Sequence, residues 1–154
     1  MKDADVLSTP GHLISLAARG FVRLSEARLK PLGFGVGHLP VLIALKEGVA
    51  NTQRDLARFA RVEQPPMAQM LARMERDGLI KRTPDTTDRR SSLIALTATA
   101  NRKLPKAVAT LFEGNEDALE GFSEDEGRQL VALLGRVIAN LDRLVAQNVQ
   151  SGND

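Results

Sequence analysis

The side chains best suited to recognition chemistry lie between residues 64 and 76, where amide and guanidinium groups recur among small residues. Gln69 and Arg73 are four positions apart, a spacing that puts two side chains on one face of a helix. A glutamine amide can bond adenine and a guanidinium can bond guanine, while small residues allow close approach to a groove. The residues assigned to this face are Gln64, Pro66, Ala68, Gln69, Arg73 and Arg76. An ordinary solvated helix face is the alternative for this segment taken alone.

A second basic cluster follows at residues 81–90, around the turn-forming run from Pro84 to Asp88. Strand-like residues flank that run, so a β-hairpin with a long polar tip is predicted, here called the wing. Arg89 and Arg90 stand at or just past the tip, where a guanidinium can enter a minor groove. Asp88 is expected to pair with a nearby arginine and fix the shape of the tip. The alternative is an exposed ion pair worth at most about 1 kcal/mol. The wing residues assigned to DNA are Arg82, Thr87, Asp88, Arg89 and Arg90.

Two short helices must position these groups. Thr52 is suited to the N-cap of the first, with Asp55 three residues on. Its apolar residues form one stripe, expected to be buried, of Leu56, Phe59 and Ala60. The residues assigned to the DNA backbone at this helix are Thr52, Arg54 and Arg61.

The second helix carries the glutamine and arginine face. Pro65 fits its first turn, where no N–H needs to be donated, and Gly78 suits its end. Its apolar side should pack against Leu56 and Phe59, and consists of Met67, Met70, Leu71 and Met74. Helix, tight turn, helix and hairpin together are typical of a winged helix-turn-helix, which indicates DNA binding.

Two motifs in this stretch resemble the MarR family of bacterial transcriptional regulators. One is the wing pattern from Asp88 to Arg90, followed by an apolar strand that ends in Leu-Thr at residues 96–97; the other runs from Met74 to Ile80 as MERDGLI. The resemblance covers nearly the whole chain. It implies one domain over residues 1–154, mainly α with a small β-hairpin wing. It implies a winged core at 36–97 and dimerisation helices at 9–30 and 98–148.

By the same resemblance, the chain is expected to be a ligand-responsive repressor. It would bind double-stranded DNA as a homodimer on a pseudo-palindromic operator, with the recognition helix in the major groove and the wing in the minor groove. The prolines at 65 and 66 replace the Ser and Thr residues often found in the family. That departure shifts the expected base readout toward Gln69 and Arg73.

The flanking segments read as amphipathic helices. Thr9-Pro10 opens a helix that Pro31-Leu32-Gly33 ends, and residues 36–45 read as a more buried helix. Thr97 can cap a helix that Pro105 should kink or split. A capping box at residues 123–126 opens a final helix with a wide apolar stripe. Apolar faces at both ends predict homodimerisation, although they could instead cover one monomeric core.

Charge is distributed unevenly along a chain whose net charge is only +2. Residues 54–90 hold nine Lys or Arg against six Asp or Glu, whereas residues 97–154 hold six against nine. The positive excess thus falls on the predicted DNA face, where phosphate contacts give affinity without sequence information. No apolar run reaches membrane length and no signal peptide is recognised. A cytoplasmic bacterial protein, associated with the nucleoid through DNA, is expected.

Enzyme, metal and cofactor chemistry find little support. The chain has no Cys, and His12 and His38 lack metal-ligand spacing. The glycines at 33, 35 and 37 lack the preceding strand that a phosphate-binding loop needs. No enzymatic activity and no cofactor are therefore expected. The rival function is a winged helix that serves as a protein-interaction module without DNA specificity.

The family resemblance also implies a small aromatic or phenolic effector, bound between the dimerisation helices and the winged core. The segments that could line such a pocket contribute His12, Arg19, Phe21, Phe34 and His38. Each has a structural alternative, with Phe21 and Phe34 as core residues and His12 as a helix-terminal polar group. Without Cys, an effector signal cannot come through a thiol.

Overall fold

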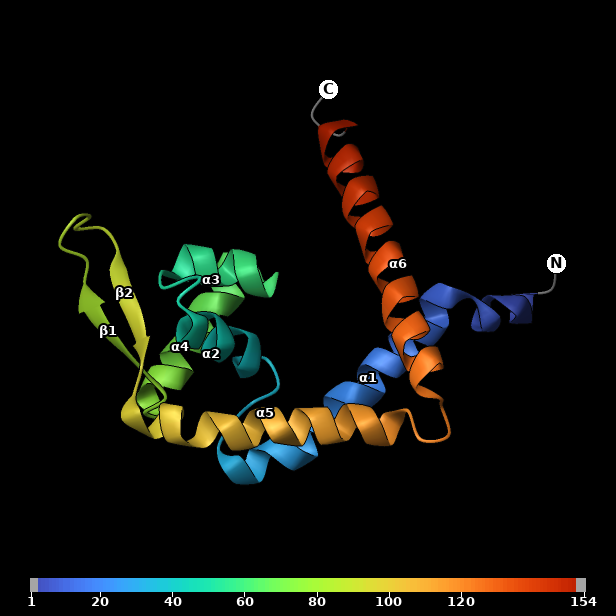
Figure 1. The fold of residues 1–154 in the computed structure, drawn as a ribbon. Coiled ribbons are helices and arrows are strands. Elements are labelled where there is room, and N and C mark those ends of the chain that lie inside the picture. The colour runs from blue at the N-terminus through green and yellow to red at the C-terminus, as the bar shows by residue number, and fades with distance from the viewer. Residues whose placement is uncertain (1–2, 152–154) are drawn as a thin grey trace. The chain divides into compact units, whose positions relative to one another are not determined.

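A computed structural model describes residues 3–151 of the chain. It divides into two compact units, residues 1–114 and 115–154. Helices make up most of the described chain, and one two-stranded sheet completes it (Figure 1), so the predicted fold class is confirmed. The elements in order are the 3-10 helix η1 (Asp3–Ser8), α1 (Pro10–Leu29), the 3-10 helix η2 (Lys30–Leu32), α2 (His38–Glu47), α3 (Gln53–Ala60), α4 (Gln64–Arg76), β1 (Ile80–Pro84), β2 (Ser92–Leu96), α5 (Ala98–Ala118) and α6 (Glu124–Ser151).

The predicted caps set the helix boundaries. The Thr9 hydroxyl accepts a hydrogen bond from the His12 N–H at the start of α1. The Asp55 N–H donates to the Thr52 hydroxyl at 3.3 Å, and α3 begins directly after Thr52. Gly78 has a φ of 73°, the left-handed conformation that glycine adopts without strain, and it follows the end of α4.

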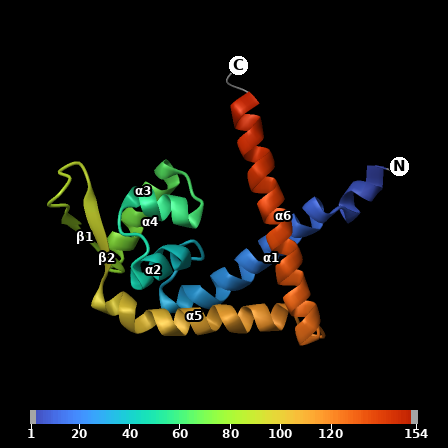
Figure 2. The same cartoon turned by 45° about the horizontal axis from the view of Figure 1, so that its top comes forward.

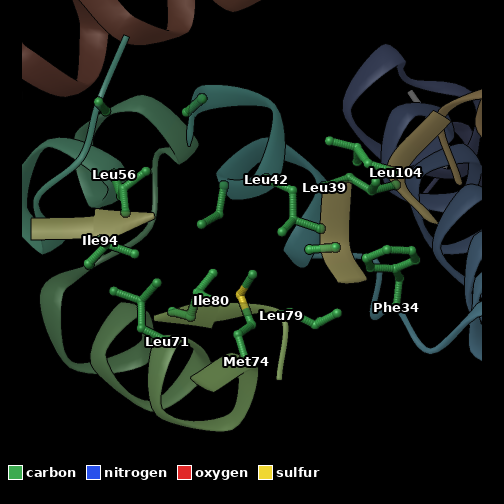
Figure 3. Close-up of a cluster of buried hydrophobic side chains, with 14 of the residues drawn as sticks. Phe34, Leu39, Leu42, Leu56, Leu71, Met74, Leu79, Ile80, Ile94 and Leu104 are labelled. Carbon is green, nitrogen blue, oxygen red and sulfur yellow. The ribbon is translucent and has the colours of Figure 1, made fainter. Parts of the chain in front are cut away.

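The helices α2, α3 and α4 pack on one another and on the hairpin (Figure 2). Figure 3 shows their shared core, in which leucines from each helix meet Ile80 of β1 and Ile94 of β2. Leu104 of α5 and Phe34 of the loop before α2 close the same cluster. The glutamine and arginine helix is therefore fixed to a rigid support on its apolar side.

One expected core residue is not in the core. Phe59 is 48% exposed, whereas Leu56 and Ala57 of the same helix are buried. α3 has only eight residues, and it contacts the core through Leu56, Ala57 and the partly buried Ala60. The prediction that Phe59 packs beneath α4 was therefore wrong. Of the predicted stripe, Leu56 is buried and Ala60 is partly buried, and only Phe59 lies outside the core.

The wing is an antiparallel pair of strands in which Ile80 faces Leu96 and Pro84 faces Ser92. The Ile94 N–H donates to the Asn51 carbonyl at 2.8 Å, which ties β2 to the segment before α3. At the other end, the Thr97 hydroxyl donates to the Gly78 carbonyl at 2.6 Å and accepts the Ala100 N–H at 3.2 Å. Thr97 thus caps α5, as predicted, and also anchors the base of the hairpin.

The C-terminal helices differ from prediction in one respect. α5 continues through Pro105 without a break, so the helix is not split there, while the expected kink at Pro105 stays a prediction. Leu104 and Ala107 on either side of the proline are fully buried in the core, and this packing holds the helix together although one backbone hydrogen bond is lost. The capping box before α6 is confirmed, because the Ser123 N–H donates to the Glu126 carboxylate at 2.7 Å and the Glu126 N–H to the Ser123 hydroxyl at 3.2 Å.

Candidate DNA interface

The helix α4 presents two chemically different sides. Met67, Leu71 and Met74 are fully buried beneath it. On the opposite side, Pro66, Gln69, Arg73 and Arg76 are exposed and Ala68 is half-buried, while Gln64 is exposed as the first residue of the helix. Arg76 lies 3.8 Å from Asp77, an exposed pair that contributes little to stability. The exposed side thus offers amide and guanidinium donors to a partner.

The first turn of α4 has few backbone donors. Glu63 occupies the N-cap in an extended conformation and its side chain caps no N–H. Pro65 and Pro66 follow within the first turn, and neither has an N–H to donate. Helix N-termini often bind phosphate through these N–H groups. At α4, polar contacts from the first turn must therefore come mainly from side chains.

Internal hydrogen bonds shape the tip of the wing. The hydroxyl and the N–H of Thr87 both donate to the Asp85 carboxylate, at 2.7 and 2.9 Å, and hold the pKa of Asp85 below its ordinary value. The Asp88 carboxylate accepts the Arg90 N–H at 2.9 Å. Asp88 was predicted to fix the tip by pairing with a guanidinium. It instead bonds the backbone of Arg90, because an Asx-type contact two residues on needs no long side chain to be ordered.

Those contacts leave the two wing arginines available to a partner. The side chains of Arg89 and Arg90 are exposed, and no ion pair involves either of them within residues 3–151. Thr87 is exposed as well, but its polar groups already bond Asp85. The wing therefore offers two cationic side chains on a tip whose backbone is held by hydrogen bonds.

A polar groove joins the wing to α3 and to the start of α4. It is lined by Thr52, Gln53, Arg54, Asp55, Arg58, Gln64, Arg82, Asp85, Asp88, Arg90, Ser91 and Ser92. Four arginines face three aspartates there, and two of these aspartates bond the wing loop while Asp55 lies 3.9 Å from Arg58. The groove therefore brings predicted residues from three elements together around a basic surface.

Arg82 connects the wing to α4. Its Nε lies 3.7 Å from the Glu75 carboxylate, within ion-pair distance but too far for a hydrogen bond. The side chain is only 28% exposed, and its buried Nε has no hydrogen-bond partner among residues 3–151. Arg82 was predicted as a wing contact to DNA. Its position indicates that it also sets the spacing between β1 and α4.

Six residues that line the groove were not assigned to the site from the sequence: Gln53, Asp55, Arg58, Asp85, Ser91 and Ser92. Gln53 directly follows the N-cap of α3, and Arg58 lies four residues after Arg54 on the same helix. The i, i+4 spacing of the two arginines was a usable signal. Gln53 gave no such signal, because Gln64, the residue that it bonds, is eleven residues away on another helix. The predicted backbone residues Thr52 and Arg54 line the groove, whereas Arg61 ends α3 with a φ of 54°.

The residues proposed for an effector pocket are spread over α1 and the α2 junction. Phe34 is buried in the core, as its structural alternative predicts, whereas Phe21 is 37% exposed. A shallow cavity along α1 is lined by Arg19 with Ala18, Val22 and Arg23, and includes none of the other four candidates. His12 lies in the first turn of α1. That these five residues line one effector-binding pocket stays a prediction.

His38 opens α2 beneath the recognition face. Its Nδ1 accepts the Gly35 N–H at 2.9 Å, so the neutral ring holds the loop before α2. Burial lowers the pKa of His38 from its ordinary value and Arg73 lowers it further, whereas Asp77 acts in the opposite direction. Protonation at Nδ1 would remove the acceptor that the Gly35 N–H uses.

Stability should therefore depend on the protonation of His38. Its pKa in the folded protein lies below the ordinary value of 6.5, so the unfolded chain binds the proton more tightly. The stabilisation that the neutral His38 ring gives the folded protein is complete above pH 6.5. It is lost as the pH falls from 6.5 toward the pKa of His38 in the folded protein. We expect the free energy of unfolding to drop between about pH 7.5 and pH 5.5, and to drop less in His38→Gln. Urea titrations at both pH values measure this, and equal drops in the two proteins would contradict it.

Comparisons with known proteins agree with this geometry. Residues 38–92 match the model of the MarR family. A mutant of Escherichia coli MarR solved with operator DNA has a TM-score of 0.79 and 22% identity, over 89% of this chain and 99% of that one. The transcriptional regulator SlyA has a TM-score of 0.76 and 27% identity, over 84% and 92%. S. aureus MepR in a DNA complex has a TM-score of 0.77 and 24% identity, over 86% and 98%.

The chain is thus a winged helix-turn-helix protein. It is similar to proteins of the MarR family, whose model matches residues 38–92 and whose solved structures share its fold. This similarity agrees with the expectation that the chain is not an enzyme, since the matched family consists of transcriptional regulators. Across the described residues 3–151, no helix is long and apolar enough to span a bilayer.

Proposed function

We propose that this protein is a sequence-specific DNA-binding regulator of transcription that acts as a repressor. The observation that carries the proposal is the exposed face of α4 beside a basic groove and a wing with two unpaired arginines. α4 enters the major groove and the wing the adjacent minor groove. Related structures of MarR with operator DNA and of MepR with DNA support this assignment. The regulated DNA places the protein at the nucleoid in the bacterial cytoplasm.

The wing arginines supply affinity for DNA rather than sequence specificity. Arg89→Ala or Arg90→Ala should weaken binding to specific and to scrambled DNA alike, and should reduce the slope of log affinity against log salt by about 1. Fluorescence anisotropy at several salt concentrations measures both quantities. Arg102→Ala removes an exposed arginine outside the groove and the wing, and serves as the matched control. A salt slope unchanged in both wing variants would remove the wing from the DNA-binding surface.

The protein acts as a homodimer. α6 has 28 residues and buries none of those whose exposure is described, although it carries many apolar side chains. Those more than two-fifths exposed include Val131, Leu133, Ile138, Leu141, Leu144 and Val145. α1 has a similar exposed set, led by Leu13 and Leu16. Apolar faces of this extent usually mark association surfaces. A twofold dimer would set two copies of α4 about one DNA turn, or 34 Å, apart, which suits a pseudo-palindromic operator.

Sedimentation equilibrium tests this assembly. The wild-type protein should sediment with twice the 16.7 kDa mass of one chain. Leu141→Arg puts a charge in the exposed apolar face of α6 and should shift the mass toward that of the monomer. The exposed Arg102 again provides a control, since Arg102→Ala leaves the apolar faces intact. A wild-type protein that is monomeric at micromolar concentration would contradict the proposed dimer.

The family resemblance extends the proposal to a small aromatic or phenolic effector. The polar candidates are His12 and Arg19 on α1 and His38 on α2, and no described cavity joins the two helices' candidates. Binding measurements with a panel of phenolic acids, in the presence of operator DNA, address this part alone. Release of DNA by any member of the panel would support it.

A further inference from the structure

Two glutamines connect the beginnings of α3 and α4. Gln53 is the first residue of α3 and Gln64 is the first residue of α4. The Nε2 of Gln53 donates to the Oε1 of Gln64 at 3.1 Å. Both side chains also line the basic groove, together with arginines from α3 and from the wing. The pair thus sits where the DNA backbone is expected, at the end of the recognition helix that lies closest to base edges in helix-turn-helix complexes.

The bond fixes the orientation of the Gln64 amide. A free glutamine amide can present either its oxygen or its nitrogen on a given side. In the structure, the oxygen of Gln64 faces the Gln53 donor. Oε1 keeps a second lone pair, and Nε2 keeps both of its N–H groups. One acceptor and one donor, side by side, are the groups that match N6–H and N7 of adenine in the major groove.

Pro65 and Pro66 make the side chain of Gln64 more important for contacts from the first turn of α4. Pro65 and Pro66 cannot donate from the backbone, so the first turn of α4 has lost its usual means of bonding an acceptor. Gln64 is the exposed amide in that turn. Because Gln53 already holds it in one orientation, less conformational freedom is lost when it meets a base.

We propose that Gln64 reads an adenine in the major groove and that Gln53 is its positioning residue. This inference rests on the proposed DNA-binding function and assigns part of its sequence specificity. Gln69 and Arg73 lie about one and a half and two and a half turns further along α4, so they would read other base pairs of the same half-site. Gln53 acts through Gln64 and has no base contact of its own.

The test begins with selection of bound sites from a random DNA library by the full-length protein. Affinities are then measured for the selected site and for each single base-pair replacement in one half-site. The wild type should lose about tenfold in affinity when one particular A·T pair becomes G·C. Gln64→Ala should abolish that loss at that position alone. Gln53→Ala should reduce it, and the double variant should match Gln64→Ala, because the two side chains act as one unit.

Two controls separate a positioning role from a structural one. Gln53→Ala removes no charge and should leave the salt slope and the helical circular dichroism spectrum unchanged, which a misfolded helix pair would not. Gln129→Ala, an exposed glutamine of α6, should leave every base preference unchanged. If Gln64→Ala retains all preferences of the wild type, the inference is wrong while the proposed function stands. A wild type without any base preference would overturn both.

Discussion

Leu71→Ala should lower the free energy of unfolding by about 2–5 kcal/mol, the largest effect that we expect from a single substitution. Leu71 is fully buried beneath α4, in the cluster that joins this helix to α2, α3 and the hairpin. Truncation removes apolar contacts and leaves a cavity that packed helices fill only in part. Urea unfolding followed by circular dichroism measures the change.

A surface residue provides the comparison for Leu71. Val49 lies in the same unit but is 60% exposed, and Val49→Ala should change stability by less than about 0.5 kcal/mol. Equal effects of the two substitutions would mean that α4 does not pack on this core.

Arg73→Ala should weaken binding to a specific operator by about 1–3 kcal/mol, with a smaller effect on scrambled DNA. Arg73 is exposed in the middle of the recognition face, and no ion pair holds it within the described residues. A guanidinium so placed can form two hydrogen bonds with guanine. Gln69→Ala, one turn earlier, should have an effect of similar size.

The ratio of specific to non-specific affinity is the informative measurement for these two variants. A residue that contacts only phosphate lowers both affinities together, so the ratio stays constant. Arg102→Ala again controls for the loss of one positive charge. If the ratio is unchanged in both Gln69→Ala and Arg73→Ala, the middle of α4 does not read bases.

Local signals in the sequence predict most of the fold. Thr52, Thr97 and Ser123 cap the helices at the expected positions, and Gly78 takes the left-handed conformation after α4. Each of these depends on atoms within a few residues, so composition and spacing are sufficient to find them. The alternation of apolar and polar residues then places Leu71 and Arg73 on opposite sides of α4.

Contacts between distant residues were not predictable in this way. Periodicity places Phe59 on the apolar stripe of α3, but the packing of a helix this short buries a narrower stripe and leaves the ring exposed. The ion pair of Arg82 with Glu75 and the bond of Gln53 with Gln64 each join two elements. Their geometry depends on how the elements pack, which propensity and capping rules do not describe.

The candidate site was predicted only in part, because some of its contacts also depend on the conformation of the folded chain. The residues of α4 follow from helical spacing, and the arginines of the wing follow from the turn between two strands. The role of Asp88 could not be predicted from the sequence. A short carboxylate can bond either a guanidinium or a nearby backbone N–H, and the same neighbouring residues allow both. Only the conformation of the tip distinguishes the Arg90 N–H as its partner.

Selection from random double-stranded DNA, followed by titration of the selected site and a scrambled site with the purified protein, tests the central claim most directly. We expect enrichment of an inverted repeat with half-site centres about one helical turn apart, and at least about a thousandfold preference for it over the scrambled site at physiological salt. No enriched sequence, with equal affinity for both DNAs, would contradict a sequence-specific regulator.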